Sequence, residues 1–446
     1  FFLLAYDQQE FNQTKQLDPS RIEPRVVNLF AALGSPEENG SIDRTNDARV
    51  FLGKVDYQLN PSNLFTVRYN YTWSTQENGT FDVDSWGRSA NGTERDFSNS
   101  VSGSLLSTVS SNKLNEFRFQ LAREDRPRPY DGPDVNGQTR PFPDTAFDFG
   151  SSYRFGMPFF LPVEYYDTRF QITNNFTLIK GSHTIKVGGE FNRVNSVQTF
   201  IGFANSRYVF GSTQGFLNYQ QFGPKYVECS NGSTSTTGAC PAGTSIAGPL
   251  LLFLQQAGVG GLSVEEAGTQ SIPQLEPSLF IQDKWQPNAN LTVSYGLRWE
   301  AQIQPDPITP ASEVFYAPLI GTSNFPSDGT IPSDMKMFQP RLGISWDPNA
   351  DGRQVLRFST GLFYARIPGL NLASSRSTNG SRGQTLYRDS TFNGFGVTPP
   401  TWPNLIPQSE IANPNHPDVF VFDQNFQNPR TFSTTVAYER ELVSKL

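Results

Sequence analysis

Apolar and polar residues alternate strictly along several stretches of this chain, and the clearest stretch is residues 291–300. Its apolar positions are Leu291, Val293, Tyr295, Leu297 and Trp299, and polar residues or glycine stand between them. Because successive side chains of a strand point to opposite faces, this stretch predicts a strand with one apolar and one hydrophilic face.

The same alternation recurs over residues 64–73 and in four further stretches. Each stretch is about nine or ten residues long, the length that a tilted strand needs to cross a bilayer. We therefore predict an all-β protein, an antiparallel transmembrane β-barrel, of which this chain supplies about 12–14 strands. In residues 64–73 the apolar positions are Phe65, Val67, Tyr69, Tyr71 and Trp73.

The composition is compatible with a barrel and argues against a membrane protein built from helices. Only 36% of the 446 residues are hydrophobic, and the mean hydropathy is −0.45. The longest apolar run, residues 249–254, is far shorter than the roughly 20 residues of a spanning helix. A barrel has low mean hydropathy because only alternate residues face lipid. The net charge of −7 and the lack of a Lys/Arg run predict no nucleic-acid partner.

Short and long connections alternate between the expected strands. Gly181 and Ser182 link residues 170–180 to residues 183–193, and glycine at the first position favours a type II′ hairpin turn. The resulting register places Lys180 opposite His183. It also predicts the pairs Phe176 with Val187, Asn174 with Gly189 and Ile172 with Phe191, and the comparable register of an earlier hairpin pairs Gly53 with Tyr69.

The long connections are rich in Gly, Pro, Asn, Asp and Ser, and we expect them to be irregular loops. Short periplasmic turns that alternate with long extracellular loops are typical of outer-membrane barrels. A soluble β-sandwich is the alternative, but its strands usually have only about five or six residues. The long segments are residues 11–47, 74–97, 124–166, 195–276, 302–337 and 367–429.

The two faces of the expected strands differ in their side chains. Charged residues would be intolerable on the lipid face, so we expect them to line the lumen, where they contact water or a plug domain. Aromatic residues near the strand ends are expected to face lipid and form two girdles at the headgroups. The lumen-facing candidates are Lys54, Arg68, Arg118, Glu190, Arg298, Glu300 and Arg357, together with Glu116 and Lys186. The lipid-facing candidates are Phe65, Tyr69, Tyr71, Trp73, Trp285, Tyr295, Trp299 and Trp346.

Cys229 and Cys240 are the only cysteines, and they flank a flexible polar segment. A disulfide between them would fit an oxidising, extracytoplasmic compartment, and two free thiols are the alternative. Only His183 and His416 are available as histidine ligands, and neither is near the cysteines, so a zinc site is not expected.

The chain shows no catalytic constellation, and we predict neither an enzyme nor a cofactor. With two histidines, no Ser/His/Asp or metal–histidine site can be proposed. Asp131, Asp134 and Asn136, with Asp144 and Asp148, could form a calcium-binding loop because hard cations prefer oxygen ligands. A solvated, turn-rich loop is the favoured alternative.

Several segments are similar to the barrels of TonB-dependent receptors. The resemblance rests on residues 278–285 and 290–300, which form a barrel hairpin, and on residues 338–347 and 181–191. The long loops, residues 51–57 and the opening strand at residues 1–6 most resemble the Oar-like branch. The resemblance spans nearly the whole chain, although these segments say little about a substrate.

The resemblance implies a 22-stranded barrel, a plug domain inside it and a short segment that contacts TonB. We expect the 446 residues to be one partial barrel, because this sequence includes no signal peptide, plug or TonB box. The expected partners are outer-membrane lipid, the missing plug, the TonB system and an unknown ligand.

The leading functional hypothesis is an outer-membrane receptor that imports a scarce or bulky ligand captured by its extracellular loops. The alternatives are a structural, adhesion or secretion-associated barrel, a passive porin, or a soluble extracellular binding protein. Candidate ligand contacts are loop aromatics, since function concentrates in loops. They are Tyr153, Phe159, Tyr165, Tyr208, Phe210, Trp402 and Phe420.

Overall fold

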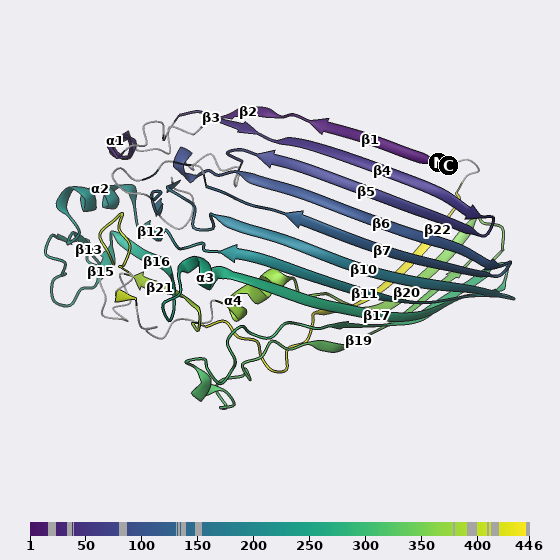
Figure 1. The fold of residues 1–446 in the computed structure, drawn as a ribbon. Helices are drawn as coiled ribbons and strands as arrows, with labels where there is room; N and C mark the ends of the chain where they lie inside the picture. Colours follow the sequence, from purple (N-terminus) through teal and green to yellow (C-terminus); the bar gives the residue numbers. More distant parts are fainter. Residues whose placement is uncertain are drawn as a thin grey trace.

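Twelve strands form one antiparallel sheet that curves like part of a barrel wall in the computed structural model (Figure 1). The structure describes residues 1–16, 24–33, 38, 40–79, 87–130, 132, 134, 140–147, 154–377, 380–389, 399–407, 410–411 and 419–442. The strands are, in spatial order, β1 (Phe2–Gln9), β4 (Asp47–Asn60), β5 (Asn63–Gln76), β6 (Glu94–Ser110), β7 (Lys113–Asp125), β10 (Val163–Lys180), β11 (His183–Phe200), β17 (Thr269–Asn288), β18 (Leu291–Gln302), β19 (Asp334–Trp346), β20 (Gln354–Tyr364) and β22 (Arg430–Arg440). The predicted all-β barrel architecture is confirmed, and the sheet is open in the described residues, with β1 and β22 at its edges.

The strand registers follow the hydrophobic alternation. Lys180 lies opposite His183, and Gly181 adopts the positive φ of +60° that its tight turn requires. The predicted pairs of β10 with β11 are present, and Gly53 lies opposite Tyr69. A shift of one residue would have turned every apolar side chain to the wrong face, so the register is strongly specified.

Many strands are longer than the alternation predicts. β17 has 20 residues, and β10 and β11 have 18 each, whereas crossing a bilayer takes about 9–11. The additional residues lie toward the long connections, where the strict alternation of apolar and polar residues stops. Backbone pairing continues there without lipid, so the alternating pattern marks only the membrane-facing part of each strand.

A second assembly, which we call the cap, lies at the end of the sheet opposite the short turns (Figure 1). It is built around a five-stranded sheet in the order β21-β16-β12-β8-β9. Its strands are β8 (Asp144–Phe147), β9 (Arg154–Phe155), β12 (Arg207–Phe210), β16 (Leu250–Gly258) and β21 (Gly383–Asp389), and its helices are α1 (Pro24–Ala32) and α2 (Thr213–Phe222). A three-stranded sheet consists of β13 (Val227–Cys229), β14 (Thr234–Ser235) and β15 (Ile246–Gly248).

The remaining elements are short. They are β2 (Asn12–Lys15), β3 (Ile42–Thr45), η2 (Arg88–Ala90), α3 (Val264–Gly268), η3 (Ala317–Leu319), η4 (Gly369–Leu372) and α4 (Ala373–Arg376). No helix in the described part of the chain is both long and apolar enough to span a membrane.

The expectation that the long segments are irregular is wrong for the cap. Phe30, Phe155, Phe210, Phe216 and Trp402 come from four of these segments and pack into one buried core. The Phe30 and Phe155 rings stack at 3.7 Å, and Phe210 meets Phe216 edge-on at 4.8 Å. Each segment alone has too few apolar residues for a core, but together they bury a continuous one.

Cys229 and Cys240 form a disulfide at the edge of the cap, with their Cα atoms 5.7 Å apart. The bridge closes a loop that contains the turn after β13 and the short strand β14, which pairs with β13. On its other side β13 pairs with β15. The bridge therefore holds a small hairpin that contributes little to the aromatic core.

Candidate functional site

The main sheet separates charged from aromatic side chains. Residues directly opposite each other in neighbouring strands share a face, so the registers assign a face to every strand residue. The inner face is defined here as the face that packs against η4 and α4. It carries all seven charged lumen-facing candidates: Lys54, Arg68, Arg118, Glu190, Arg298, Glu300 and Arg357.

Charges on the inner face are paired mostly along their own strands. Lys54 meets Asp56 at 2.9 Å, and Arg118 pairs with Glu116. Arg298 pairs with Glu300, again two residues away. Because residues i and i+2 of a strand share a face, the wall neutralises its own charges locally. Arg357 differs, since its partner Glu439 lies 2.7 Å away on the neighbouring strand β22.

All eight aromatic candidates lie on the opposite, outer face: Phe65, Tyr69, Tyr71, Trp73, Trp285, Tyr295, Trp299 and Trp346. Trp285 stacks on His183 with ring centroids 5.8 Å apart, close to the short turns. At the other end, Arg49 lies 5.0 Å above the Trp73 ring. The outer face thus has aromatic residues near both ends of an apolar band.

One polar cluster interrupts this band. The Tyr295 hydroxyl donates to Asp283 Oδ2 at 2.9 Å, and His183 Nδ1 lies 2.5 Å from the same oxygen. Asp283 is a buried carboxylate on the outer face, and its hydrogen-bond partners include the side chains of Tyr295 and His183. It lies two positions from Trp285, near the short-turn end, where burial of a charge in lipid costs least.

The inner face is not bare, because residues 365–377 fold back against it. This stretch, which we call the inner segment, includes η4 and α4 and follows β20. Leu372 and Ile367 pack on Ile272 of β17, which is fully buried. Gln270 donates to Ala373 O at 3.0 Å, and Gln274 donates to Ile367 O at 2.9 Å, so amide side chains of the wall hold its backbone.

Arg366 anchors the start of the inner segment. Its guanidinium lies 2.7 Å from Glu276 and 3.8 Å from both Glu190 and Glu300. These carboxylates come from β17, β11 and β18, so one side chain connects three neighbouring strands. Arg298, from the wall itself, also contacts Glu190 at 3.9 Å.

Amide groups complete this network. Gln302, which is fully buried, accepts a hydrogen bond from Ile367 N at 2.8 Å and donates to Ile367 O at 2.9 Å. Asn428 donates to Gln302 at 2.7 Å and to Ala365 O at 3.0 Å, which ties the segment leading into β22 to the same point. Buried polar groups that are satisfied in this way fix one arrangement of the inner segment.

Three of the loop aromatics predicted to capture a ligand are instead part of the cap core. Tyr208 and Phe210 are fully buried, and Trp402 is 5% exposed. The Tyr208 hydroxyl donates to Asn404 O at 2.5 Å, and the Trp402 indole donates to Thr145 at 2.9 Å. These side chains are therefore unavailable to a ligand, and the prediction that they bind one is wrong. Of the other candidates, Phe420 is 56% exposed.

Phe159 lies between two arginines of an ionic group in the cap. Asp144 is fully buried and pairs with Arg154 and, at 3.5 Å, with Arg207. Both guanidinium groups lie over the Phe159 ring. Burial lowers the pKa of Arg207, and the neighbouring carboxylate of Asp144 opposes that shift. Tyr165, at the start of β10, makes a similar cation–π contact, because its ring lies 4.6 Å from the Arg126 guanidinium.

The calcium-loop candidates do not form a described site. Asp131, Asn136 and Asp148 lie outside the described residues, as does the aromatic candidate Tyr153. Asp134 is exposed and forms an isolated β-bridge with Pro141. Asp144 is already paired with Arg154 and Arg207. In the part of the chain that the structure describes, no group of three or more His, Cys, Asp or Glu residues could hold a metal ion.

Two features were not anticipated from the sequence. Arg366 lies just before a segment expected to be a loop, and no local motif connects it to carboxylates on three strands. Arg123 and Arg193 lie on the outer face, in register with Asn99 and Phe170 respectively. The sequence of β11 does contain a signal for the position of Arg193. Arg193 follows Val187 and Phe191 by an even number of residues, so its side chain lies on the same face as theirs.

Solved structures similar to this chain are outer-membrane receptors and transporters. The outer membrane transporter YddB from Escherichia coli has a TM-score of 0.52 at 9% identity, and the match covers 99% of this chain and 42% of that protein. The siderophore receptor PiuA from Acinetobacter baumannii has a TM-score of 0.39 at 9% identity, with 85% and 47% covered. This chain thus spans less than half the length of either protein. At these identities the match to YddB supports the fold alone.

Family comparison gives the clearest assignment. No curated protein sequence matches the chain significantly. Residues 4–446, however, match the outer membrane beta barrel domain. This match agrees with the twelve-stranded antiparallel sheet, its apolar outer face and its polar inner face. The chain therefore belongs to the outer membrane beta barrel domain family, resembles the outer membrane transporter YddB in fold, and is a protein of the outer membrane.

Proposed function

We propose that this chain is the barrel portion of an outer-membrane receptor that takes up a scarce or bulky ligand using energy relayed by TonB. The observation that carries the proposal is the inner face, a polar wall with a folded segment held against it by hydrogen bonds and ion pairs. The segment adds no strand to the main sheet, so it could move without breaking the sheet. The proposal requires no catalytic step.

In this proposal the short turns face the periplasm and the cap faces the cell exterior. A plug domain and the TonB system are the required partners, and the Oar-like branch is the subgroup that the sequence favours. Binding would promote transport only if it shifts the plug between two states for which the ligand has different affinities.

Solute depletion by cells that carry the full-length protein tests the proposal. Spent medium is compared between cells with and without TonB, and between cells with and without the protein. We expect at least one solute to be removed only when both are present. If depletion depends on the protein but persists without TonB, passive passage is the better interpretation.

The arrangement at Arg366 offers a second, independent test. Arg366→Gln removes the charge that joins the inner segment to three carboxylates, and we expect faster entry of a large antibiotic that the outer membrane normally excludes. Arg298→Gln is the matched control, because it removes the same charge from the same cluster but leaves the inner segment anchored. Equal entry through the two variants would mean that the inner segment does not restrict passage.

A second candidate function is a structural, adhesion or secretion-associated barrel. It is favoured by the cap, whose ordered core projects beyond the main sheet and buries the aromatics expected to bind a ligand. Deletion of the gene distinguishes the two functions. A defect in surface attachment or secretion, without any TonB-linked change in solute uptake, would favour this candidate.

A further inference from the structure

A groove of about 520 Å³ lies where the apolar band of the outer face meets polar residues toward the cap. Tyr69, Val101, Leu121 and Phe170 form one row of directly opposed residues across β5, β6, β7 and β10. Arg193 of β11 continues this row. The groove therefore joins an aromatic and aliphatic floor to a cationic end.

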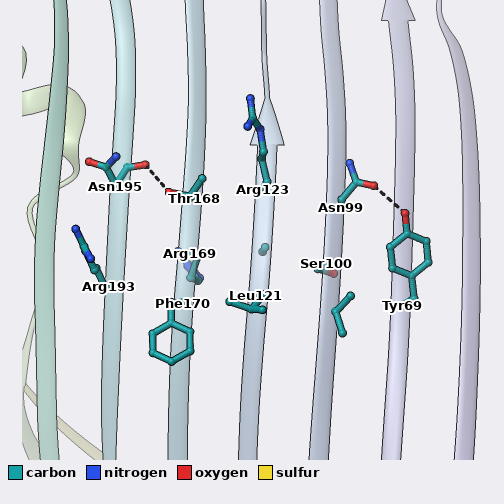
Figure 2. A pocket seen from close by; sticks show the side chains of 12 residues that line it. Tyr69, Asn99, Ser100, Leu121, Arg123, Thr168, Arg169, Phe170, Arg193 and Asn195 are labelled. Carbon is teal, nitrogen blue, oxygen red and sulfur yellow. Dashed lines mark hydrogen bonds between the residues drawn. The ribbon is translucent and has the colours of Figure 1, made fainter.

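The next row toward the cap is polar. It contains Asn99, Arg123, Thr168 and Asn195, which oppose one another across β6, β7, β10 and β11. Figure 2 shows Asn99, Arg123 and Asn195 on one side of the groove, with Phe170 and Leu121 on the other. This arrangement has the polarity of the boundary between lipid headgroups and acyl chains.

The polar row presents donors to the groove. The Tyr69 hydroxyl donates to Asn99 Oδ1 at 2.8 Å, and the Ser271 hydroxyl donates to Asn195 Oδ1 at 2.7 Å. Each amide oxygen accepts one of these bonds, and among the described residues neither NH₂ group has an acceptor, so both can donate to a ligand. These donors favour an acceptor-rich ligand.

The two arginines of the groove differ in their pairing. Arg123 is held by Asp125 at 3.0 Å and lies 4.8 Å from the Tyr166 ring. Arg193 is exposed, and no carboxylate among the described residues pairs with it. A cation on the lipid-facing surface is unfavourable unless an anion or the headgroup region compensates it. Phosphate oxygens bind a guanidinium through two parallel hydrogen bonds and suit this position.

We propose that this groove binds the headgroup of an anionic, phosphate-bearing lipid in the leaflet nearest the cap. Arg193 contacts the phosphate, and the Asn99 and Asn195 amides donate additional hydrogen bonds. An acyl chain of the lipid lies along Val101, Leu121 and Phe170. Charge complementarity and the change from polar to apolar lining select this occupant, and the site acts independently of any transported ligand.

The proposal is tested by native mass spectrometry of the full-length protein in detergent, titrated with phosphatidylglycerol or with lipid A. The two lipids share an anionic phosphate but differ in their backbone, so they separate the two possible sources of the headgroup. We expect Arg193→Gln to weaken binding of at least one of them by about tenfold or more, as the loss of a charge-assisted pair implies.

Arg68→Gln is the matched control. Arg68 neighbours Tyr69 in β5 but belongs to the inner face and does not line the groove, so its loss changes net charge equally without altering the groove. Leu121→Trp fills the apolar floor and keeps every charge, and we expect it to weaken lipid binding while binding of glycerol phosphate stays unchanged. Heat-dependent gel mobility confirms that each variant has folded.

Two results would overturn the proposal. One is wild-type affinity of Arg193→Gln for both lipids. The other is an equal loss in Arg193→Gln and Arg68→Gln, which would indicate general electrostatic attraction instead of a site. Binding of only one lipid, with dependence on Arg193, supports the proposal and identifies the lipid class.

Discussion

The main sheet and the cap bury apolar surface in opposite directions. In the sheet, Leu297 and Phe170 point outward and are 44% and 37% exposed to the surroundings of the chain. In the cap, Phe210 and Phe216 point inward and are fully buried. The sheet relies on lipid to cover its apolar side chains, whereas the cap covers its own.

This difference determines how each region responds to substitution. Lipid is fluid and fills the space left by a truncated side chain, but a packed protein core does so only in part. A charge, in contrast, is tolerated at a hydrated loop surface and is costly in the bilayer. The two regions should therefore be sensitive to different kinds of change.

Truncation of a core aromatic in the cap should have the largest effect. Phe210→Ala removes a ring that meets Phe216 and Tyr219, and we expect a loss of about 3–5 kcal/mol in cap stability. Phe170→Ala deletes the same atoms from the outer face and should cost much less. Limited proteolysis at the surface of intact cells measures both, and similar sensitivity of the two variants would contradict the comparison.

The main sheet should be more sensitive than the cap to an introduced charge. Leu297→Arg places a cation on the outer face near the bilayer midplane, at a cost of about 2–4 kcal/mol. Ser294→Arg lies three residues earlier in β18 but on the inner face, where water solvates the charge. The amount of folded, heat-modifiable barrel in membranes is the measurement. Equal losses for the two variants would invalidate the assignment of faces.

The sequence predicts the sheet well because water and lipid impose a period of two on it. The alternation identifies the strands and the faces of residues such as Tyr295 and Arg298, and a two-residue turn fixes the register of β10 with β11. It does not locate the cap-side strand ends, because backbone pairing continues in β17 after lipid contact stops.

The cap and the inner segment were harder to predict because their contacts join distant parts of the chain. Phe30, Phe155, Phe216 and Trp402 meet in one core, although no periodic pattern connects them. Local signals did exist. The β-prone residues 207–210 and the apolar run at residues 249–254 pair as β12 and β16, and Ser263 with Glu266 forms a capping box at α3.

The disulfide should affect the edge of the cap more than its core. Replacing both Cys229 and Cys240 by serine removes at most about 3 kcal/mol of chain-entropy stabilisation from the short loop between them. We expect faster proteolysis between residues 229 and 240, with little change in the unfolding temperature of the cap. Reduction of the wild-type protein with a thiol should reproduce the effect. A large fall in that temperature would show that the hairpin supports the aromatic core.

The smallest expected effect is a pH dependence of stability, which distinguishes the cap from the sheet without changing any contact at neutral pH. Burial raises the pKa of Tyr208 well above its ordinary value, because the phenolate would lose its hydration inside the core. The folded-state pKa exceeds the unfolded value of about 10, so the stabilisation is complete below that pH and is lost progressively above it. Alkaline titration followed by tyrosinate absorbance should therefore show the cap unfolding before the sheet.

The variant Tyr208→Phe is the control, because it lacks this titrating group. It also loses the hydrogen bond to Asn404, so its cap should be less stable at neutral pH, and that stability should depend less steeply on alkaline pH. An unchanged pH dependence in that variant would place the titrating group elsewhere in the cap, with the buried Tyr219 as the next candidate.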